Sequence, residues 1–242
     1  MSEAIANRLG VTGSSVVVRS LVRTELPRPP ASLVSAISQA AVNRLSELVG
    51  RMYTMDAAIR ALGKTAIAVT GIATTTKCAP GDNLGLVKAL TLVQPGDVLV
   101  VDAQGFEAWC LGGYQLLRYA REHHGLAGVI VNGAYRDADE AHAAGFPLYA
   151  RCLAPYSGPK AGPFEVNVPV CCGGVIVQPG DIVSASGEGV VVVPQRSLQA
   201  VADALAGDVI GAYDTDNLLH ALFAKADRFD CDATSGTDRT GA

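Results

Sequence analysis

The stretch VIVNGAYRDADE, residues 129–140, passes from an apolar strand through a glycine turn into the start of a helix. Such a passage is typical of α/β proteins, which place ligands where strands end and helices begin. Arg136 and Asp137 stand at that point of the chain. An arginine offers a planar fork that matches a carboxylate, and an aspartate offers a hard oxygen ligand for Mg²⁺. The alternative is structural: Asp137 would cap the helix, and Arg136 and Glu140 would pair on its surface.

On either side of this stretch, the pattern of apolar residues alternates helices with strands. Strands are predicted over 67–78, 97–102, 129–131 and 148–151, and helices over 30–49, 55–62, 83–93, 114–124 and 137–144. Residues 169–194 look entirely β, and two closing helices are predicted over 197–206 and 218–228. This order predicts the α/β class, with a continuous Val-Leu-Val-Val strand buried at the centre.

The composition indicates one globular domain. The 242 residues are 49% hydrophobic and 17% charged, and a chain of this length forms a core without disulfides. The net charge is −4 and the pI about 5.5, so the chain lacks the cationic footprint of non-specific nucleic-acid binding. We predict a single domain over 1–229, with an N-terminal extension at 1–26 and a disordered polar tail at 230–242.

Cysteine usage and the lack of targeting signals favour the cytoplasm. The chain shows no secretory leader and no apolar run of about 20 residues that could span a bilayer. None of its cysteines forms a Cys-x-x-Cys pair, and small core thiols are their expected role. They are Cys78, Cys110, Cys152, Cys171, Cys172 and Cys231. We expect reduced thiols and neither a membrane nor a nucleic-acid partner.

The tripeptide Pro-Gly-Asp occurs three times, at residues 80–82, 95–97 and 179–181. Pro followed by Gly is the signature of a type II turn, because only glycine takes the required positive φ at little cost. The spacing is irregular, so the tripeptides indicate shared turn chemistry and not a repeat array.

Two further stretches could contribute to a site. In WCLGGYQLL, residues 109–117, a glycine-rich loop leads into a helix whose free N–H groups favour a carboxylate. In KCAPGDN, residues 77–83, Asp82 or Asn83 is suited to cap the next helix, and Lys77 either faces a site or extends along the surface. For both stretches, an ordinary entry into a helix is the alternative.

Five blocks in order along residues 27–206 resemble the RraA-like family, which includes the 4-hydroxy-4-methyl-2-oxoglutarate aldolases. They are KCAPGDN (77–83), DVLVVD (97–102), NGAYRD (132–137), EVNVPV (165–170) and the segment 180–194 that ends in GVVVVP. The resemblance implies a compact α/β/β sandwich of the swivelling phosphohistidine-domain type. It also implies a homotrimer or homohexamer with sites between subunits.

The aldolases of this family cleave 4-hydroxy-2-oxo diacids to pyruvate and a second 2-oxo acid, and they decarboxylate oxaloacetate, with Mg²⁺ or Mn²⁺. The resemblance thus implies a metal-dependent lyase that acts on a small 2-oxo acid through an enolate. Arg136, Asp137 and Glu140 match the Arg-Asp-x-x-Glu/Asp half of the family motif. By that match Asp137 binds the metal, Arg136 binds substrate and stabilises the enolate oxygen, and Glu140 lies just outside the metal ligands.

Further site residues follow from the same resemblance. Backbone N–H groups near Leu116 and Leu117 would hold the substrate carboxylate, and Glu47 would act as a catalytic acid in a neighbouring subunit. The family's Gly-plus-acid pair falls on Tyr114 and Gln115, which would line the substrate pocket. Because a neutral amide cannot act as a base and Tyr is larger than Gly, we expect a reshaped pocket mouth and a different substrate.

Two other functions stay open at this point. Some relatives regulate an RNA-degrading complex by binding its protein components, and the missing acid suits such a non-catalytic role. The other is an enzyme that runs different carbon–carbon or tautomerising chemistry through the same enolate.

Overall fold

The computed structural model describes residues 18–207 and 215–226. By its internal contacts the chain divides into a compact unit that ends at Leu205 and a second unit that begins at Ala206. The described part of the second unit contains helix α8 (Thr215–Ala226). The single domain over 1–229 stays a prediction, and the extension's first 17 residues and the tail at 230–242 lie outside the described residues.

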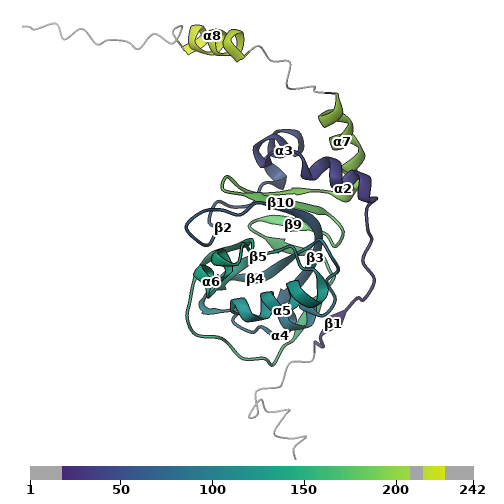
Figure 1. The fold of residues 1–242 in the computed structure, drawn as a ribbon, viewed down its shortest axis with the longest axis vertical. Helices are drawn as coiled ribbons and strands as arrows, with labels where there is room; N and C mark the ends of the chain where they lie inside the picture. Colours follow the sequence, from purple (N-terminus) through teal and green to yellow (C-terminus); the bar gives the residue numbers. More distant parts are fainter. Residues whose placement is uncertain (1–17, 208–214, 227–242) are drawn as a thin grey trace, which may run out of the picture. The chain divides into compact units, whose positions relative to one another are not determined.

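Four parallel strands form the centre of the first unit. They are β3 (Val69–Cys78), β4 (Asp97–Cys110), β5 (Gly128–Tyr135) and β6 (Leu148–Leu153). The helices that join them in turn are α4 (Leu84–Leu90), α5 (Tyr114–His124) and α6 (Ala138–Ala143). All three helices cover the same face of the sheet (Figure 1), as expected of successive right-handed β-α-β units.

A second β layer covers the opposite face. Its strands are β8 (Val170–Cys172), β9 (Val175–Val177), β10 (Ile182–Ser186) and β11 (Gly189–Val193). β8 and β9 pair only with each other, whereas β10 pairs with both β11 and β3, so the main sheet continues into the second layer. Outside this layer lie α2 (Ala31–Ser38), α3 (Val42–Val49) and α7 (Leu198–Ala206).

Short elements complete the unit. β1 (Leu21–Val22) and β7 (Phe164–Val166) extend the sheet beyond β3, and β2 (Arg60–Ala61) lies beside β6. Two 3₁₀ turns, η1 (Arg51–Tyr53) and η2 (Gln195–Ser197), flank the second layer. None of the helices within the described residues is long and apolar enough to cross a bilayer.

Strand β4 shows why the fold needs two cores. Leu99 and Val101 pack under α4–α6, whereas Val98 and Val100 pack against the second β layer. All four are fully buried. Successive side chains of a strand point to opposite faces, so a continuous apolar run requires cover on both. The mixed α/β architecture confirms the predicted class, and the swivelling phosphohistidine-domain description stays a prediction.

Two helix predictions are wrong. Residues 30–49 form two helices, α2 and α3, separated at 39–41, and the break lets both Ile37 and Leu45 reach one core. Residues 55–62 are irregular up to β2, although positions 55 and 59 have helical spacing. The N–H of Met55 donates to Val190 O (2.9 Å), and the carboxylate of Asp56 accepts the N–H of Ala58 (2.9 Å). Pairing with the second layer and this local turn replace the helix.

The three Pro-Gly-Asp turns are confirmed. Gly81, Gly96 and Gly180 have φ of 76°, 86° and 93°, as a type II turn requires. Each following aspartate closes its turn by donating its N–H to the residue three positions earlier. All three aspartates are buried, and their carboxylates accept backbone N–H groups.

Candidate active site

The candidate site begins where β5 ends, at Arg136 and Asp137. Asp137 takes the left-handed conformation (φ 60°, ψ 37°) at the position before α6 and makes no side-chain cap for that helix. Its Oδ2 instead accepts a hydrogen bond from the backbone N–H of Tyr114 (3.1 Å), the first residue of α5. Non-glycine residues adopt positive φ mainly at turns and functional sites. The capping role considered from the sequence is therefore not the one that Asp137 has.

Two glycines allow this close approach between α5 and the end of β5. A Cβ atom on Gly113 would overlap Oδ2 of Asp137, and one on Gly112 would lie 2.8 Å from the hydroxyl of Tyr135. The Tyr135 hydroxyl donates to Gly113 O (3.3 Å), and the N–H of Arg136 donates to Gly112 O (3.2 Å). Both glycine carbonyls therefore accept hydrogen bonds from the end of β5, and these bonds hold the N-terminus of α5 against Asp137.

One nitrogen of the Arg136 guanidinium is hydrogen-bonded, and another has no hydrogen-bond partner. Its Nη1 donates to Pro155 O (3.1 Å), and its Nε lies 3.7 Å from Oδ2 of Asp137. Nε is buried and has no hydrogen-bond partner among the described residues. The side chain as a whole is 43% exposed. It therefore retains donors for an anionic ligand, and among the described residues it forms no ion pair with Glu140.

The buried groups beside this pair are neutral. Burial raises the pKa of the Tyr135 hydroxyl well above its usual value, and burial also raises the pKa of the Cys110 thiol. Both groups therefore stay protonated at neutral pH, so the charge at the site comes from Arg136, Asp137 and the side chains of the groove described next.

Arg136 and Asp137 line an open groove of about 800 Å³. Its walls come from three segments: the start of α6, the chain after β6, and the loop between β2 and β3. The residues that line it are Gly63, Lys64, Arg136, Asp137, Ala138, Asp139, Glu140, Leu153, Ala154 and Pro155. Two cations and three carboxylates thus face one groove. Lys64 belongs to no motif and is the charged residue of the groove that sequence reasoning misses.

The groove suits a cation with few protein ligands. Within residues 18–207 and 215–226, no three His, Cys, Asp or Glu side chains cluster as a metal cage. Oδ1 of Asp137 takes part in none of the hydrogen bonds within the described residues, so it is open to a metal. Mg²⁺ characteristically keeps several waters and uses one or two carboxylates. Asp137, with Glu140 one helical turn further, therefore fits such an ion.

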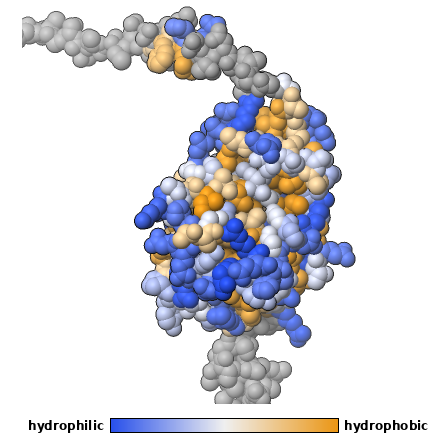
Figure 2. Space-filling view, in the orientation of Figure 1, coloured by the Kyte–Doolittle hydropathy of each residue, from blue (hydrophilic) through white to orange (hydrophobic). Residues whose placement is uncertain are grey.

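The start of α5 differs from the expectation for Tyr114 and Gln115. The ring of Tyr114 is buried and packs edge-on against Phe146, so it does not line the groove. Gln115 is exposed, and its Oε1 accepts from Nε of Arg118 (3.1 Å). The surface of the molecule around α5 is largely hydrophilic (Figure 2). The glycine beside the Arg136–Asp137 pair is Gly113. Gly113 stands one residue before Tyr114, the position matched to the glycine of the family motif.

The backbone N–H groups of this helix end are partly engaged. Tyr114 donates to Asp137, and Leu116 donates to Gly113 O (3.2 Å). The N–H of Gln115 donates no hydrogen bond to any group of the described residues outside the helix. Because no i−4 carbonyl of the helix faces it, this group is an open donor of the first turn.

Glu47 lies elsewhere in the same copy of the chain. It is exposed on α3, where it pairs with Arg44 at 3.4 Å. α3 packs on the second β layer, and α6 lies on the opposite side of the main sheet (Figure 1). The structure thus separates Glu47 from Arg136 within one copy and brings Glu140 to the groove that contains Asp137.

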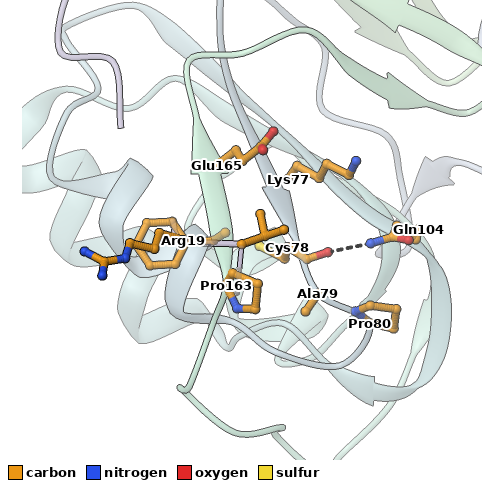
Figure 3. A pocket seen from close by; sticks show the side chains of 10 residues that line it. Arg19, Lys77, Cys78, Ala79, Pro80, Gln104, Pro163 and Glu165 are labelled. Carbon is orange, nitrogen blue, oxygen red and sulfur yellow. Dashed lines mark hydrogen bonds between the residues drawn. The ribbon is translucent and has the colours of Figure 1, made fainter. Parts of the chain in front are cut away.

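Lys77 lines a separate cavity of about 220 Å³ (Figure 3). It lies opposite Glu165 in the pairing of β3 with β7, and Gln104 closes one side by donating to Cys78 O (3.1 Å). Neither Arg136 nor Asp137 lines this cavity. The 77–83 stretch thus does not contribute Lys77 to the groove.

A family model described as Aldolase/RraA, RraA-like, matches residues 34–192, more than half of the chain. The chain belongs to the RraA-like family. The match includes both segments that meet at Asp137, the loop with Gly112 and Gly113 and the end of β5.

Curated RraA-like relatives carry an aldolase name. A 4-hydroxy-4-methyl-2-oxoglutarate aldolase of Thermus thermophilus is 38% identical over 114 residues, which are 47% of this chain and 69% of that protein. A protein of Halalkalibacterium halodurans, provisionally given the same name, is 39% identical over 127 residues, 52% of this chain and 60% of its own length. The chain thus spans less than two thirds of that second relative.

A solved structure carries a different name. RraAS2 of Streptomyces coelicolor, described as an unusual member of the RNase ES inhibitor RraA family, is 29% identical with a TM-score of 0.66. The match covers 85% of this chain and all of that one. The family therefore contains proteins named as lyases and proteins named as ribonuclease inhibitors.

Proposed function

We propose that this protein is a divalent-metal-dependent carbon–carbon lyase that cleaves or decarboxylates a 2-oxo acid. The observation that carries the proposal is the fixed Asp137 carboxylate, beside a guanidinium with open donors, at the rim of a groove and the end of a helix. Such a reaction uses a carboxylate to bind the metal ion, a guanidinium to bind the anionic substrate, and the positive end of a helix to bind a carboxylate. The aldolase names of the relatives support it.

Substrate binding falls to the first turn of α5 and to Arg136. The open N–H of Gln115 would hold the C1 carboxylate, helped by the positive end of the helix dipole. The guanidinium of Arg136 would donate to the 2-oxo oxygen, and its attachment to Pro155 fixes its direction. Tyr135, Gly112 and Gly113 hold the start of α5 at a fixed position beside Asp137.

Asp137 would hold Mg²⁺ or Mn²⁺, with Glu140 near enough to accept hydrogen bonds from the surrounding water. Bound there, the ion would supply a Lewis acid that favours negative charge on the substrate's oxygens. A single protein carboxylate with several waters is an arrangement that Mg²⁺ accepts.

In the aldol cleavage, the C3–C4 bond breaks and its electron pair moves onto the 2-oxo oxygen, where Arg136 donates to the growing charge. The proton of the C4 hydroxyl leaves as C4 becomes a carbonyl, and a proton later returns to C3 to give pyruvate. Glu47 of a neighbouring copy is the proposed acid for these transfers, in a homotrimer or homohexamer. With no acid at 114 or 115, we expect a substrate other than 4-hydroxy-4-methyl-2-oxoglutarate.

The test is pyruvate release from oxaloacetate and from a panel of 4-hydroxy-2-oxo acids, with Mg²⁺ and then with excess chelator. We expect turnover that depends on the metal, and a loss of orders of magnitude in Arg136→Ala. Turnover that neither chelator nor Asp137→Ala changes would refute the proposal.

A second candidate is a non-catalytic regulator of a ribonuclease. It is favoured by the full-length structural match to an RNase ES inhibitor relative and by the missing acid. Mixing the protein with purified RNase ES and following RNA cleavage separates the two functions. Stoichiometric inhibition, without pyruvate release from any substrate of the panel, would decide for the regulator.

A further inference from the structure

The cavity that Lys77 lines also contains a carboxylate, that of Glu165 (Figure 3). Lys77 on β3 and Glu165 on β7 lie directly opposite each other where these two strands pair antiparallel. Side chains at such positions have Cβ atoms about 4.5–5.5 Å apart and start on the same face of the strand pair. Within the described residues, neither of the two side chains forms an ion pair. Both charges therefore remain available to a ligand.

Lys77 and Glu165 set the charge of this cavity. The other ionisable side chains of its lining are Arg19 and Cys78. Figure 3 shows the guanidinium of Arg19 pointing away from Lys77 and Glu165. Burial raises the pKa of the Cys78 thiol to about 11, so this thiol is neutral at physiological pH. The cavity thus presents one positive and one negative group next to each other.

The rest of the cavity wall is mostly apolar. It comes from Val18, Ala79, Pro80, Pro163 and Phe164. Gln104 closes one side, and the hydrogen bond from its Nε2 to Cys78 O (3.1 Å) holds it there. The volume of about 220 Å³ is below the roughly 300 Å³ at which pockets for drug-sized ligands begin. An occupant that fills this cavity is therefore a small molecule with an apolar part.

We propose that this cavity binds a free α-amino acid with a small aliphatic side chain. Its carboxylate would accept from Lys77, its ammonium group would donate to Glu165, and its side chain would pack against the apolar wall. An α-amino acid carries its two charges on neighbouring groups, which matches the short distance between opposite positions of paired strands. A ligand with negative charge alone would be repelled by Glu165, and one with positive charge alone by Lys77.

The amino-acid site is separate from the candidate active site. Neither Arg136 nor Asp137 lines the cavity, and neither Lys77 nor Glu165 lines the groove. Amino-acid binding therefore does not depend on the lyase function proposed above.

Calorimetric titration of the full chain with L-valine tests the proposal. Two matched ligands each lack one charge of valine: 3-methylbutanoate has no ammonium group, and 2-methylpropylamine has no carboxylate. We expect L-valine to bind at least about tenfold more tightly than either, because a hydrogen bond between charged groups is lost in each case. No binding of L-valine, or equal affinity for L-valine and 3-methylbutanoate, would overturn the proposal.

Variants at the two charged positions assign the binding to this cavity. Lys77→Gln and Glu165→Gln should each weaken the binding of L-valine by about tenfold, since each removes one charged partner. Lys77→Arg keeps the charge and should bind L-valine within about threefold of the unmodified protein. L-valine binding that neither Lys77→Gln nor Glu165→Gln weakens would overturn the proposal.

Three controls complete the experiment. Lys225→Gln and Glu188→Gln remove exposed charges outside the cavity and should leave the affinity for L-valine unchanged. Arg136→Ala should change it by less than about twofold, because Arg136 is not in the lining and makes no contact that the ligand could lose. Loss of L-valine binding in Arg136→Ala would place the ligand in the groove and overturn the proposal. Thermal unfolding of each variant shows that a weakened affinity does not come from a misfolded protein.

Discussion

The carboxylate of Asp137 accepts a hydrogen bond of 3.1 Å from the backbone N–H of Tyr114, 23 residues earlier in the chain. This bond ties the end of β5 to the first turn of α5. It fixes Oδ2 of Asp137, and Oδ1 takes part in none of the hydrogen bonds within the described residues. The candidate anion site at the start of α5 and the candidate metal ligand Asp137 are therefore held in a fixed position relative to each other.

Asp137→Asn should lower kcat/KM for pyruvate release by about 100-fold or more, because the variant removes the charge that attracts a cation. Its side-chain oxygen can still accept the N–H of Tyr114, so the thermal midpoint should change little. Pyruvate assays across a Mg²⁺ titration measure the first effect, and thermal unfolding measures the second. Asp139→Asn is the matched control, since Asp139 is exposed in the same groove. An equal loss in both variants would contradict a specific role for Asp137.

Gly113→Ala should displace Asp137, because the new methyl group would occupy the position of its Oδ2. We expect a destabilisation of about 1–3 kcal/mol by overpacking, together with a loss of turnover. Gly187→Ala is the control: its nearest neighbour would be Ala66 Cβ at 3.4 Å, an ordinary contact. Urea unfolding of both variants tests the difference. Full activity in Gly113→Ala would show that the contact at Asp137 is not required.

Arg28→Ala should destabilise the fold by about 2 kcal/mol, because it leaves a buried carboxylate without its cation. Arg28 binds the fully buried Asp97 through two hydrogen bonds of 2.9 and 2.8 Å, and Thr74 also donates to that carboxylate. Arg44→Ala breaks the exposed pair with Glu47 and should cost at most about 0.5 kcal/mol. Comparable losses of unfolding free energy in the two variants would contradict the importance of burial.

Thiol reactivity should follow burial. Burial raises the pKa of Cys78 to about 11, so only about one thiol in a thousand is ionised at pH 8. Burial also raises the pKa of Cys172, whereas its neighbour Cys171 is exposed. We expect iodoacetamide to modify Cys171 well before Cys172 and Cys78 in the native protein, as peptide mass spectrometry would show. Cys172 reacting as fast as Cys171 would contradict the burial.

The raised pKa values of the buried thiols also make the stability of the fold depend on pH. A thiol whose pKa is raised in the folded state favours its protonated form there, and unfolding releases that constraint. Stability should therefore be constant below the ordinary cysteine pKa and fall as the pH rises through the range from that value to about 11. Replacing Cys78 by Ala should flatten this fall in urea-unfolding experiments at pH 8 to 10. Cys171→Ala is the control and should leave the slope unchanged.

Local signals predicted much of the fold. The helix over 114–124 has the bounds that the apolar periodicity predicts, and the three Pro-Gly-Asp turns have the expected positive φ at glycine. These features depend on neighbours a few residues apart. The irregular segment at 55–62 was not predictable in this way, because Met55 pairs with Val190 and Asp56 with Gly173.

The sequence alone determined the α/β class, the family and the Arg136–Asp137 pair, because each depends on short-range pattern or on motifs within a few residues. Only the tertiary structure decided that Gly113 rather than Tyr114 contacts Asp137, that the ring of Tyr114 enters the core, and that Lys64 joins the groove. These relationships join segments about 20 to 75 residues apart. They depend on how the strands align and the helices pack, which no local pattern of residues encodes.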